Sequence, residues 1–201
     1  MTRGSAHSFD GTILREYDIR GIVGGTLTGD DAYAIGRAFG SEIVRTGGDT
    51  VCVGYDGRLS SPEMEQAVVD GLKDCGVEAI RVGLGPTPML YFAVNFLSAD
   101  GGIMVSGSHN PPDYNGFKMM YVSEPFYGDD ILNLGRIAAA ADYESGGGSD
   151  RSEPMLDRYV ERILQDYREG RDLKVAWDAG NGAAGEAMVQ VAAQLPGEHI
   201  L

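Results

Sequence analysis

Apolar residues in the first 105 positions follow two periods, one typical of helices and the other typical of buried strands. Ile35, Phe39 and Ile43 lie on one face of a helix whose N-terminus Thr28 or Asp30 can cap. Similar helical patterns begin near residues 60 and 87. Short apolar runs between these helices predict strands at residues 50–55, 77–82 and 102–105. Strands joined by helical crossovers run parallel, so the pattern predicts an α/β layer fold.

The pattern becomes irregular after residue 105. A loop leads to Tyr114-Asn115-Gly116-Phe117, where Asn-Gly between aromatic residues predicts a tight hairpin turn. A helix is predicted at 131–141. The stretch 144–150 is rich in glycine and flexible by composition, and we place a domain boundary there.

The boundary divides the chain into a first domain at 1–150 and a second at 151–201. The second part has helical patterns at 155–167 and up to about residue 195, with one clear strand at 173–177. One strand in about fifty residues cannot build an independent core. We therefore expect 151–201 to be the beginning of a second domain similar to the first.

Composition narrows the class of protein. The 201 residues are 43% hydrophobic and carry a formal charge of −14, so attraction of the whole molecule to nucleic acid or to anionic membranes is not expected. No apolar stretch approaches the ~18 residues of a membrane span, and the first residues do not resemble a signal peptide. Cys52 and Cys75 lack metal-ligand spacing and read as buried thiols, so a cytoplasmic location is expected.

The stretch Ser106-Gly107-Ser108-His109-Asn110-Pro111 carries the main candidate chemistry. Ser108 follows a predicted parallel strand, where open α/β sheets place their ligand sites. Gly107 allows a close bend, and backbone N–H groups together with His109 could stabilise an anion on Ser108. An ordinary polar turn with a solvated histidine is also compatible with these residues.

Two other enzyme classes are weaker interpretations. The G-x-S-x-G elbow of hydrolases is absent around Ser108. Gly180, Gly182 and Gly185 form the G-x-G-x-x-G of dinucleotide-binding proteins, which also needs an acid at the end of the next strand. Glu198 has the spacing but would begin that strand, so we favour glycines that serve a tight turn.

The stretch from Gly107 to Lys118, Gly-Ser-His-Asn-Pro-Pro-Asp-Tyr-Asn-Gly-Phe-Lys, resembles the active-site loop of the α-D-phosphohexomutases, in particular the bacterial phosphomannomutase/phosphoglucomutase branch. Further stretches resemble that family in the same order, at 15–21, 54–60, 85–88 and 178–182. Tyr55 is a departure, because related enzymes usually carry arginine there. The resemblance implies a three-layer α/β/α domain with a mixed, mainly parallel sheet, followed by the start of a second similar domain.

The resemblance also implies a mechanism. Ser108 would carry a phosphoryl group, pass it to a hydroxyl of a hexose monophosphate, and recover the other phosphoryl group from the reoriented bisphosphate. The activity would be that of an isomerase acting between O1 and O6 of glucose or mannose phosphates. Ser108, His109, Lys118 and Arg20 would be the catalytic residues, and Tyr17, Arg20 and Lys118 would bind substrate. Mg²⁺ would bind through the phosphoryl oxygen of Ser108, with glucose 1,6-bisphosphate as the activator.

Three segments of the family are missing from this sequence, namely its Asp-Gly-Asp-x-Asp-Arg magnesium loop, its sugar-reading segment and its C-terminal phosphate-binding loop. We therefore expect the chain to work with further C-terminal domains of the same enzyme and to be inactive alone. The alternatives are half of a nicotinamide-dependent oxidoreductase or a non-catalytic module that binds an anion.

Overall fold

The computed structural model describes residues 4–122, 124–168 and 171–201. Six strands within these residues form one sheet in the order β1-β5-β4-β2-β3-β6. Their bounds are β1 (Ile19–Ile22), β2 (Thr50–Tyr55), β3 (Glu78–Leu84), β4 (Gly101–Val105), β5 (Tyr114–Tyr121) and β6 (Asp150–Ser152). β2 runs parallel to β3 and β4, and β3 runs parallel to β6, whereas β5 is antiparallel to β4 and β1. The predicted mixed, mainly parallel sheet is confirmed.

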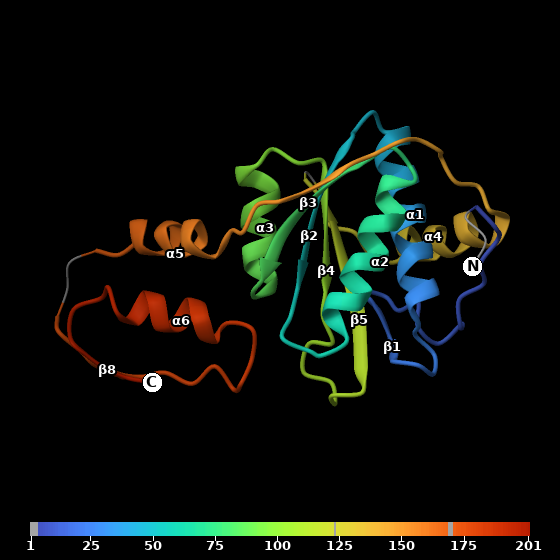
Figure 1. Ribbon diagram of the computed structural model, residues 1–201. Helices are drawn as coiled ribbons and strands as arrows, with labels where there is room; N and C mark the ends of the chain where they lie inside the picture. The colour runs from blue at the N-terminus through green and yellow to red at the C-terminus, as the bar shows by residue number, and fades with distance from the viewer. Residues whose placement is uncertain (1–3, 123, 169–170) are drawn as a thin grey trace.

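Helices cover both faces of this sheet (Figure 1). α1 (Gly29–Arg45), α2 (Ser61–Lys73) and α4 (Asp129–Ala140) pack on one face, and α3 (Thr87–Phe96) packs on the other. Alternate residues of β5 serve the two layers, because Phe117 and Met119 join the core under α1 while Met120 packs on the core under α3. The three-layer α/β/α arrangement is confirmed.

Close packing of α1 against α2 depends on two glycines. A Cβ atom on Gly36 would lie 2.3 Å from the Val68 carbonyl oxygen, and one on Gly71 would lie 2.3 Å from the Tyr33 carbonyl oxygen. The helix backbones therefore touch at this crossing. Thr28 caps α1 as predicted, in a reciprocal pair with Asp31.

A smaller unit follows. It contains α5 (Leu156–Gln165), β7 (Lys174–Ala176), α6 (Gly185–Ala192) and β8 (Glu198–Ile200), and β7 pairs with β8 in parallel. Val160, Ala187 and Val191 form its small core. The ring of Tyr159 on α5 lies 6.0 Å from that of Phe92 on α3, so α5 also rests on the first domain.

The glycine-rich stretch 144–150 is not a free linker, so its predicted flexibility is wrong. Gly146 donates its N–H to the Asp74 carbonyl oxygen at 3.0 Å, and Gly148 donates to that of Lys73 at 2.8 Å. The chain then enters β6 at Asp150, whose carboxylate lies 2.5 Å from the Lys73 amino group. These contacts tie the stretch to the first sheet. The division of the chain at residue 150 stays a prediction.

The predicted hairpin turn at Asn115-Gly116 is also wrong, since both residues lie inside β5. Asn115 is fully buried, and its amide donates to the hydroxyl groups of Ser60 and Ser61. A Cβ on Gly116 would lie 2.2 Å from the Ile19 carbonyl oxygen, so this glycine permits a close approach of β1 rather than a turn.

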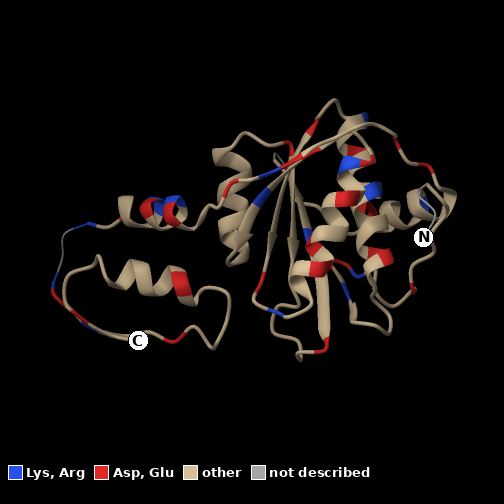
Figure 2. Cartoon of the chain, in the orientation of Figure 1, with Lys and Arg blue, Asp and Glu red and all other residues tan. Residues whose placement is uncertain are grey.

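Both cysteines are free and buried, as predicted. Burial raises the pKa of the Cys52 thiol to about 12, and it also raises the pKa of Cys75. No helix in the described part of the chain has the length and apolarity needed to cross a bilayer. Figure 2 shows that acidic side chains are distributed over both units rather than gathered in one place.

The α1–α2 crossing gives a stability prediction. Gly36→Ala should lower the free energy of unfolding by about 1–3 kcal/mol, because the new methyl group would force the helices apart. Gly29→Ala is the matched control on the same helix, since a Cβ there meets nothing within 4 Å, and it should change stability by less than about 0.5 kcal/mol. Urea unfolding of both variants measures this, and equal stabilities would contradict the close crossing.

The two units should also differ in local stability. β2 is buried between two neighbouring strands, whereas β7 has two exposed residues out of three and pairs with β8 among the described strands. Amides of β7 should therefore exchange with deuterium about a hundredfold faster than those of β2. Hydrogen-exchange mass spectrometry on the 201-residue chain tests this, and equal protection would mean that the second unit is as firmly folded as the first.

Candidate active site

The parallel strands β2, β3 and β4 end at one edge of the sheet, where their loops line a cavity of about 910 Å³. The loop after β4 contributes Ser108 and His109, and the turn after β2 contributes Arg58. Residues 85–87 after β3 form a further part of the wall. The turn at 180–184 of the second unit lines the same cavity.

Ser108 stands in an unusual backbone conformation. Its φ of 53° lies in the left-handed region, which non-glycine residues rarely occupy and which is often found at functional sites. Its N–H donates to the Ser106 hydroxyl oxygen at 2.9 Å, and its own hydroxyl lies 3.3 Å from Nδ1 of His109. The Ser108 side chain is exposed to the cavity, so a reacting group can reach it.

The turn after β2 makes hydrogen bonds to the backbone of the Ser108 loop. Asp56 accepts the N–H of Gly107 at 3.1 Å and the hydroxyl of Ser61 at 2.6 Å. The guanidinium group of Arg58 bonds to backbone carbonyl oxygens of the loop, including that of Ser108 at 2.9 Å. The sequence interpretation did not include Arg58 among the site residues, although it lies in the 54–60 stretch that carries part of the family resemblance.

Helix N-termini surround the cavity and make it favourable for an anion. The N-cap residues Ser60 of α2, Pro86 of α3 and Ala184 of α6 all line it. Within the described residues, none of these N-caps uses a side chain to satisfy the first N–H groups of its helix. The positive ends of helix dipoles attract phosphate-like groups.

Arg20 is held beside the same loop. Its guanidinium group donates to the Asn110 side-chain oxygen and to the carboxylate of Asp18. Arg20 is only 8% exposed, and its Nε atom has no hydrogen-bond partner in the described residues. It reaches this position from β1, opposite Gly116 of β5.

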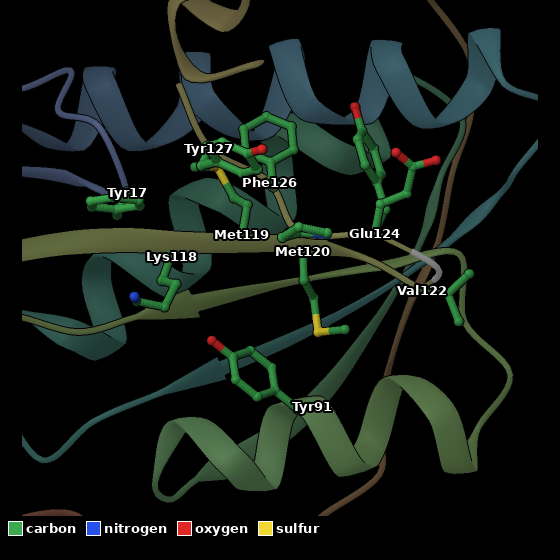
Figure 3. Close-up of a pocket in the computed structure, with 11 residues that line it drawn as sticks. Tyr17, Tyr91, Lys118, Met119, Met120, Val122, Glu124, Phe126 and Tyr127 are labelled. Carbon is green, nitrogen blue, oxygen red and sulfur yellow. The ribbon is translucent and has the colours of Figure 1, made fainter. Parts of the chain in front are cut away.

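A second cavity of about 610 Å³ lies along β5 (Figure 3). Lys118 and Tyr91 line it, together with Tyr17 and Tyr127, whose rings stack at 6.4 Å. The Lys118 amino group makes no hydrogen bond or ion pair with the part of the chain that is described. Burial raises the pKa of Tyr91, so its hydroxyl group stays protonated at neutral pH and can donate a hydrogen bond.

Comparison with known proteins decides the family. The family model described as phosphoglucomutase/phosphomannomutase, alpha/beta/alpha domain I, matches residues 11–139, well over half of the chain. This chain belongs to the phosphoglucomutase/phosphomannomutase family.

Individual relatives within the phosphoglucomutase/phosphomannomutase family agree. A phosphomannomutase/phosphoglucomutase of Pseudomonas aeruginosa is 45% identical over 185 residues, which cover 92% of this chain and 40% of the relative. A phosphoglucomutase of Neisseria meningitidis is 41% identical over 175 residues, 86% of this chain and 38% of that protein. A solved structure of a family protein from Burkholderia thailandensis superposes with a TM-score of 0.90 at 45% identity, covering 96% of this chain and 44% of that one. The chain therefore spans about 40% of the length of the curated relatives.

In this family member, the predicted site residues fall into separate places. Ser108 and His109 line the first cavity, whereas Tyr17 and Lys118 line the second. Arg20 is linked to the Ser108 loop through Asn110. Their roles in catalysis and substrate binding stay predictions. The family match gives no support to the nicotinamide-binding alternative, and the Gly180–Gly182 turn lines the serine cavity instead.

The residues present do not form a magnesium site by themselves. No group of three or more histidine, cysteine, aspartate or glutamate side chains that could hold a metal occurs among the described residues of this phosphoglucomutase/phosphomannomutase chain. Asp56, close to Ser108 in the fold, is already engaged by Gly107, Ser61 and Arg58. The predicted magnesium ligand, a phosphoryl oxygen on Ser108, stays a prediction.

The link between Arg20 and the loop can be tested. Asn110→Ala should lower the free energy of unfolding by about 1–3 kcal/mol, because a buried guanidinium group loses an acceptor. Asn95→Ala is the control, since that exposed amide bonds only to the Tyr91 carbonyl oxygen within the described structure, and it should cost less than about 0.5 kcal/mol. Denaturant unfolding of the two variants compares them, and an unchanged Asn110→Ala protein would mean that Asp18 alone holds Arg20.

Proposed function

We propose that this chain supplies the phosphoserine domain of a phosphohexose mutase, an isomerase that moves a phosphoryl group between O1 and O6 of glucose or mannose phosphate. One observation carries the proposal. Ser108 presents an exposed hydroxyl in a left-handed backbone conformation to a cavity bordered by helix N-termini. The names of the relatives, phosphomannomutase and phosphoglucomutase, support hexose phosphates as substrates.

In the proposed reaction, the bond between phosphorus and Oγ of Ser108 breaks while a hydroxyl oxygen of the hexose monophosphate bonds to the same phosphorus. The hydroxyl proton passes to a base, for which Lys118 and His109 are the candidates, and a proton is returned to the departing Oγ of Ser108. The resulting bisphosphate reorients in the site, and its other phosphoryl group is then transferred to Ser108. The overall change is an isomerisation, and the serine ends in its starting phosphorylated state.

The protein groups act mainly by placing charge and by orienting the reactants. N–H groups at the helix N-termini would hold the phosphoryl oxygens on Ser108. Arg20 and Lys118 would attract the phosphate of the sugar. The aromatic walls at Tyr17 and Tyr91 beside Lys118 are suited to the apolar face of a hexose ring.

The remaining parts of the proposal concern what this chain does not supply. We propose Mg²⁺ as cofactor and glucose 1,6-bisphosphate as activator, with the phosphoryl oxygen of Ser108 as one magnesium ligand. Further carboxylate ligands must come from outside the described residues, because Mg²⁺ needs them to be held in place. We therefore propose that C-terminal domains of the same enzyme are partners of this chain and that the chain alone has no turnover. Its free buried thiols favour a cytoplasmic location.

A chimera tests the proposal, in which this chain replaces the matching part of the Pseudomonas aeruginosa relative. Incubation with glucose 1,6-bisphosphate and Mg²⁺ should place one phosphoryl group on Ser108, found by phosphopeptide mass spectrometry. Ser108→Ala should abolish both the label and the conversion of glucose 1-phosphate to glucose 6-phosphate. Ser98→Ala is the control, since Ser98 is an exposed serine outside the cavity, and it should keep the label at position 108.

Two results would overturn the proposal. One is label on another serine with Ser108 unmodified. The other is turnover by the isolated 201-residue chain at the rate of the chimera, which would remove the need for further domains.

A further inference from the structure

The guanidinium group of Arg58 lies under the Ser108 loop and binds its backbone at several points. Nη1 donates to the carbonyl oxygens of Pro111 at 2.6 Å and Tyr114 at 2.9 Å. Nη2 donates to those of Ser108 at 2.9 Å and Asn110 at 2.7 Å. The terminal N–H groups of Arg58 are thus matched by carbonyl oxygens from a single loop.

The Arg58 side chain is itself held in place. Its Nε atom lies 3.3 Å from the carboxylate of Asp56, and its side chain is 14% exposed. The same carboxylate accepts the Gly107 N–H, so Asp56 connects the arginine to the start of the loop. The Arg58 side chain is therefore also held by a contact other than the carbonyl oxygens that it binds.

Gly107 fits this arrangement because it has no side chain. A Cβ atom at position 107 would lie 2.3 Å from the central carbon of the Arg58 guanidinium group. The planar group therefore packs directly against the backbone that precedes Ser108. An alanine at position 107 would have to displace Arg58.

We propose that Arg58 is the positioning residue that keeps Ser108 in its left-handed conformation and so directs Oγ into the cavity. The inference rests on the proposed function of Ser108 as the phosphoryl carrier. Arg58 donates to the carbonyl oxygens of Ser108, Asn110 and Pro111 and so fixes the loop from the strained residue onward. Asp56, which is paired with Arg58, holds the Gly107 N–H just before it. Lysine cannot replace it, because an ammonium group offers three donors at one point and not a planar fork.

The structural half of the inference is tested on the 201-residue chain by hydrogen exchange. Arg58→Ala and Arg58→Lys should each speed exchange of the amides of 107–114 by about tenfold or more, while those of β2 stay protected. Arg45→Ala is the control, since Arg45 also donates to a backbone carbonyl, that of Asp142, but lies outside the cavity. It should leave the exchange of 107–114 unchanged.

The functional half is tested in the chimera by the rate at which Ser108 is phosphorylated. Arg58→Ala should lower this rate by about a hundredfold, because a reacting oxygen displaced by about 1 Å loses that much. Gly107→Ala should also lower it. The double variant should be no slower than Arg58→Ala, because the added methyl group acts by displacing the arginine.

The outcomes separate the two proposals. A parent chimera with no label on Ser108 overturns the proposed function, and hydrogen exchange still decides whether Arg58 holds the loop. Unchanged exchange of 107–114 in Arg58→Ala overturns the inference. Faster exchange with an unchanged phosphorylation rate also overturns it, since the loop would then not need Arg58 to present Ser108. If the reductions in phosphorylation rate of the two single variants multiply in the double variant, Gly107 and Arg58 act separately, which contradicts the inference.

Discussion

Tyr55 at the end of β2 lies opposite Val105 at the end of β4, and the N–H of Asp56 donates to the Val105 carbonyl oxygen at 2.9 Å. This parallel register makes the two chains leave the sheet side by side. Asp56 and Arg58 therefore lie beneath Gly107 and Ser108 although about fifty residues separate the pairs in sequence. A shift of one residue in the register would exchange the faces of the strand and remove these contacts.

The net charge of the whole molecule repels anions, whereas the helix N-termini that border the cavity attract them. A net charge of −14 repels anions at long range, but salt screens exposed charges beyond about 8 Å. Close to Ser108, Asp56 is paired with Arg58, and helix N-termini present N–H groups. Local dipoles at hydrogen-bond distance therefore decide what the cavity can hold.

Much of this structure could be predicted because local patterns and tertiary packing agree. The strand at 50–55 and the cap at Thr28 follow from apolar spacing and from capping chemistry. The errors arose where distant contacts decide. Asn115-Gly116 has the composition of a turn, yet hydrogen bonds to the hydroxyl groups of Ser60 and Ser61 and the approach of β1 make it a strand. β6 has three exposed polar residues, so no hydrophobic pattern marks it.

The sequence also predicted part of the candidate site, namely the residues that lie close together along the chain. Ser108 and His109 stand on one short loop and could be found together. The place of Lys118 in a second cavity depends on the faces of β5, and the function of Arg58 depends on carbonyl oxygens, which every residue possesses. Any residue type can supply a backbone carbonyl oxygen, so the contacts of Arg58 could not be predicted from the sequence.

The left-handed backbone at position 108 also restricts which residue can serve as the proposed phosphoryl carrier. Serine tolerates a φ of 53° at moderate cost, whereas a β-branched side chain is a true outlier in that region. Threonine has the same hydroxyl group and could in principle carry a phosphoryl group equally well. The conformation of the main chain, and not the chemistry of the hydroxyl, therefore selects serine over threonine here.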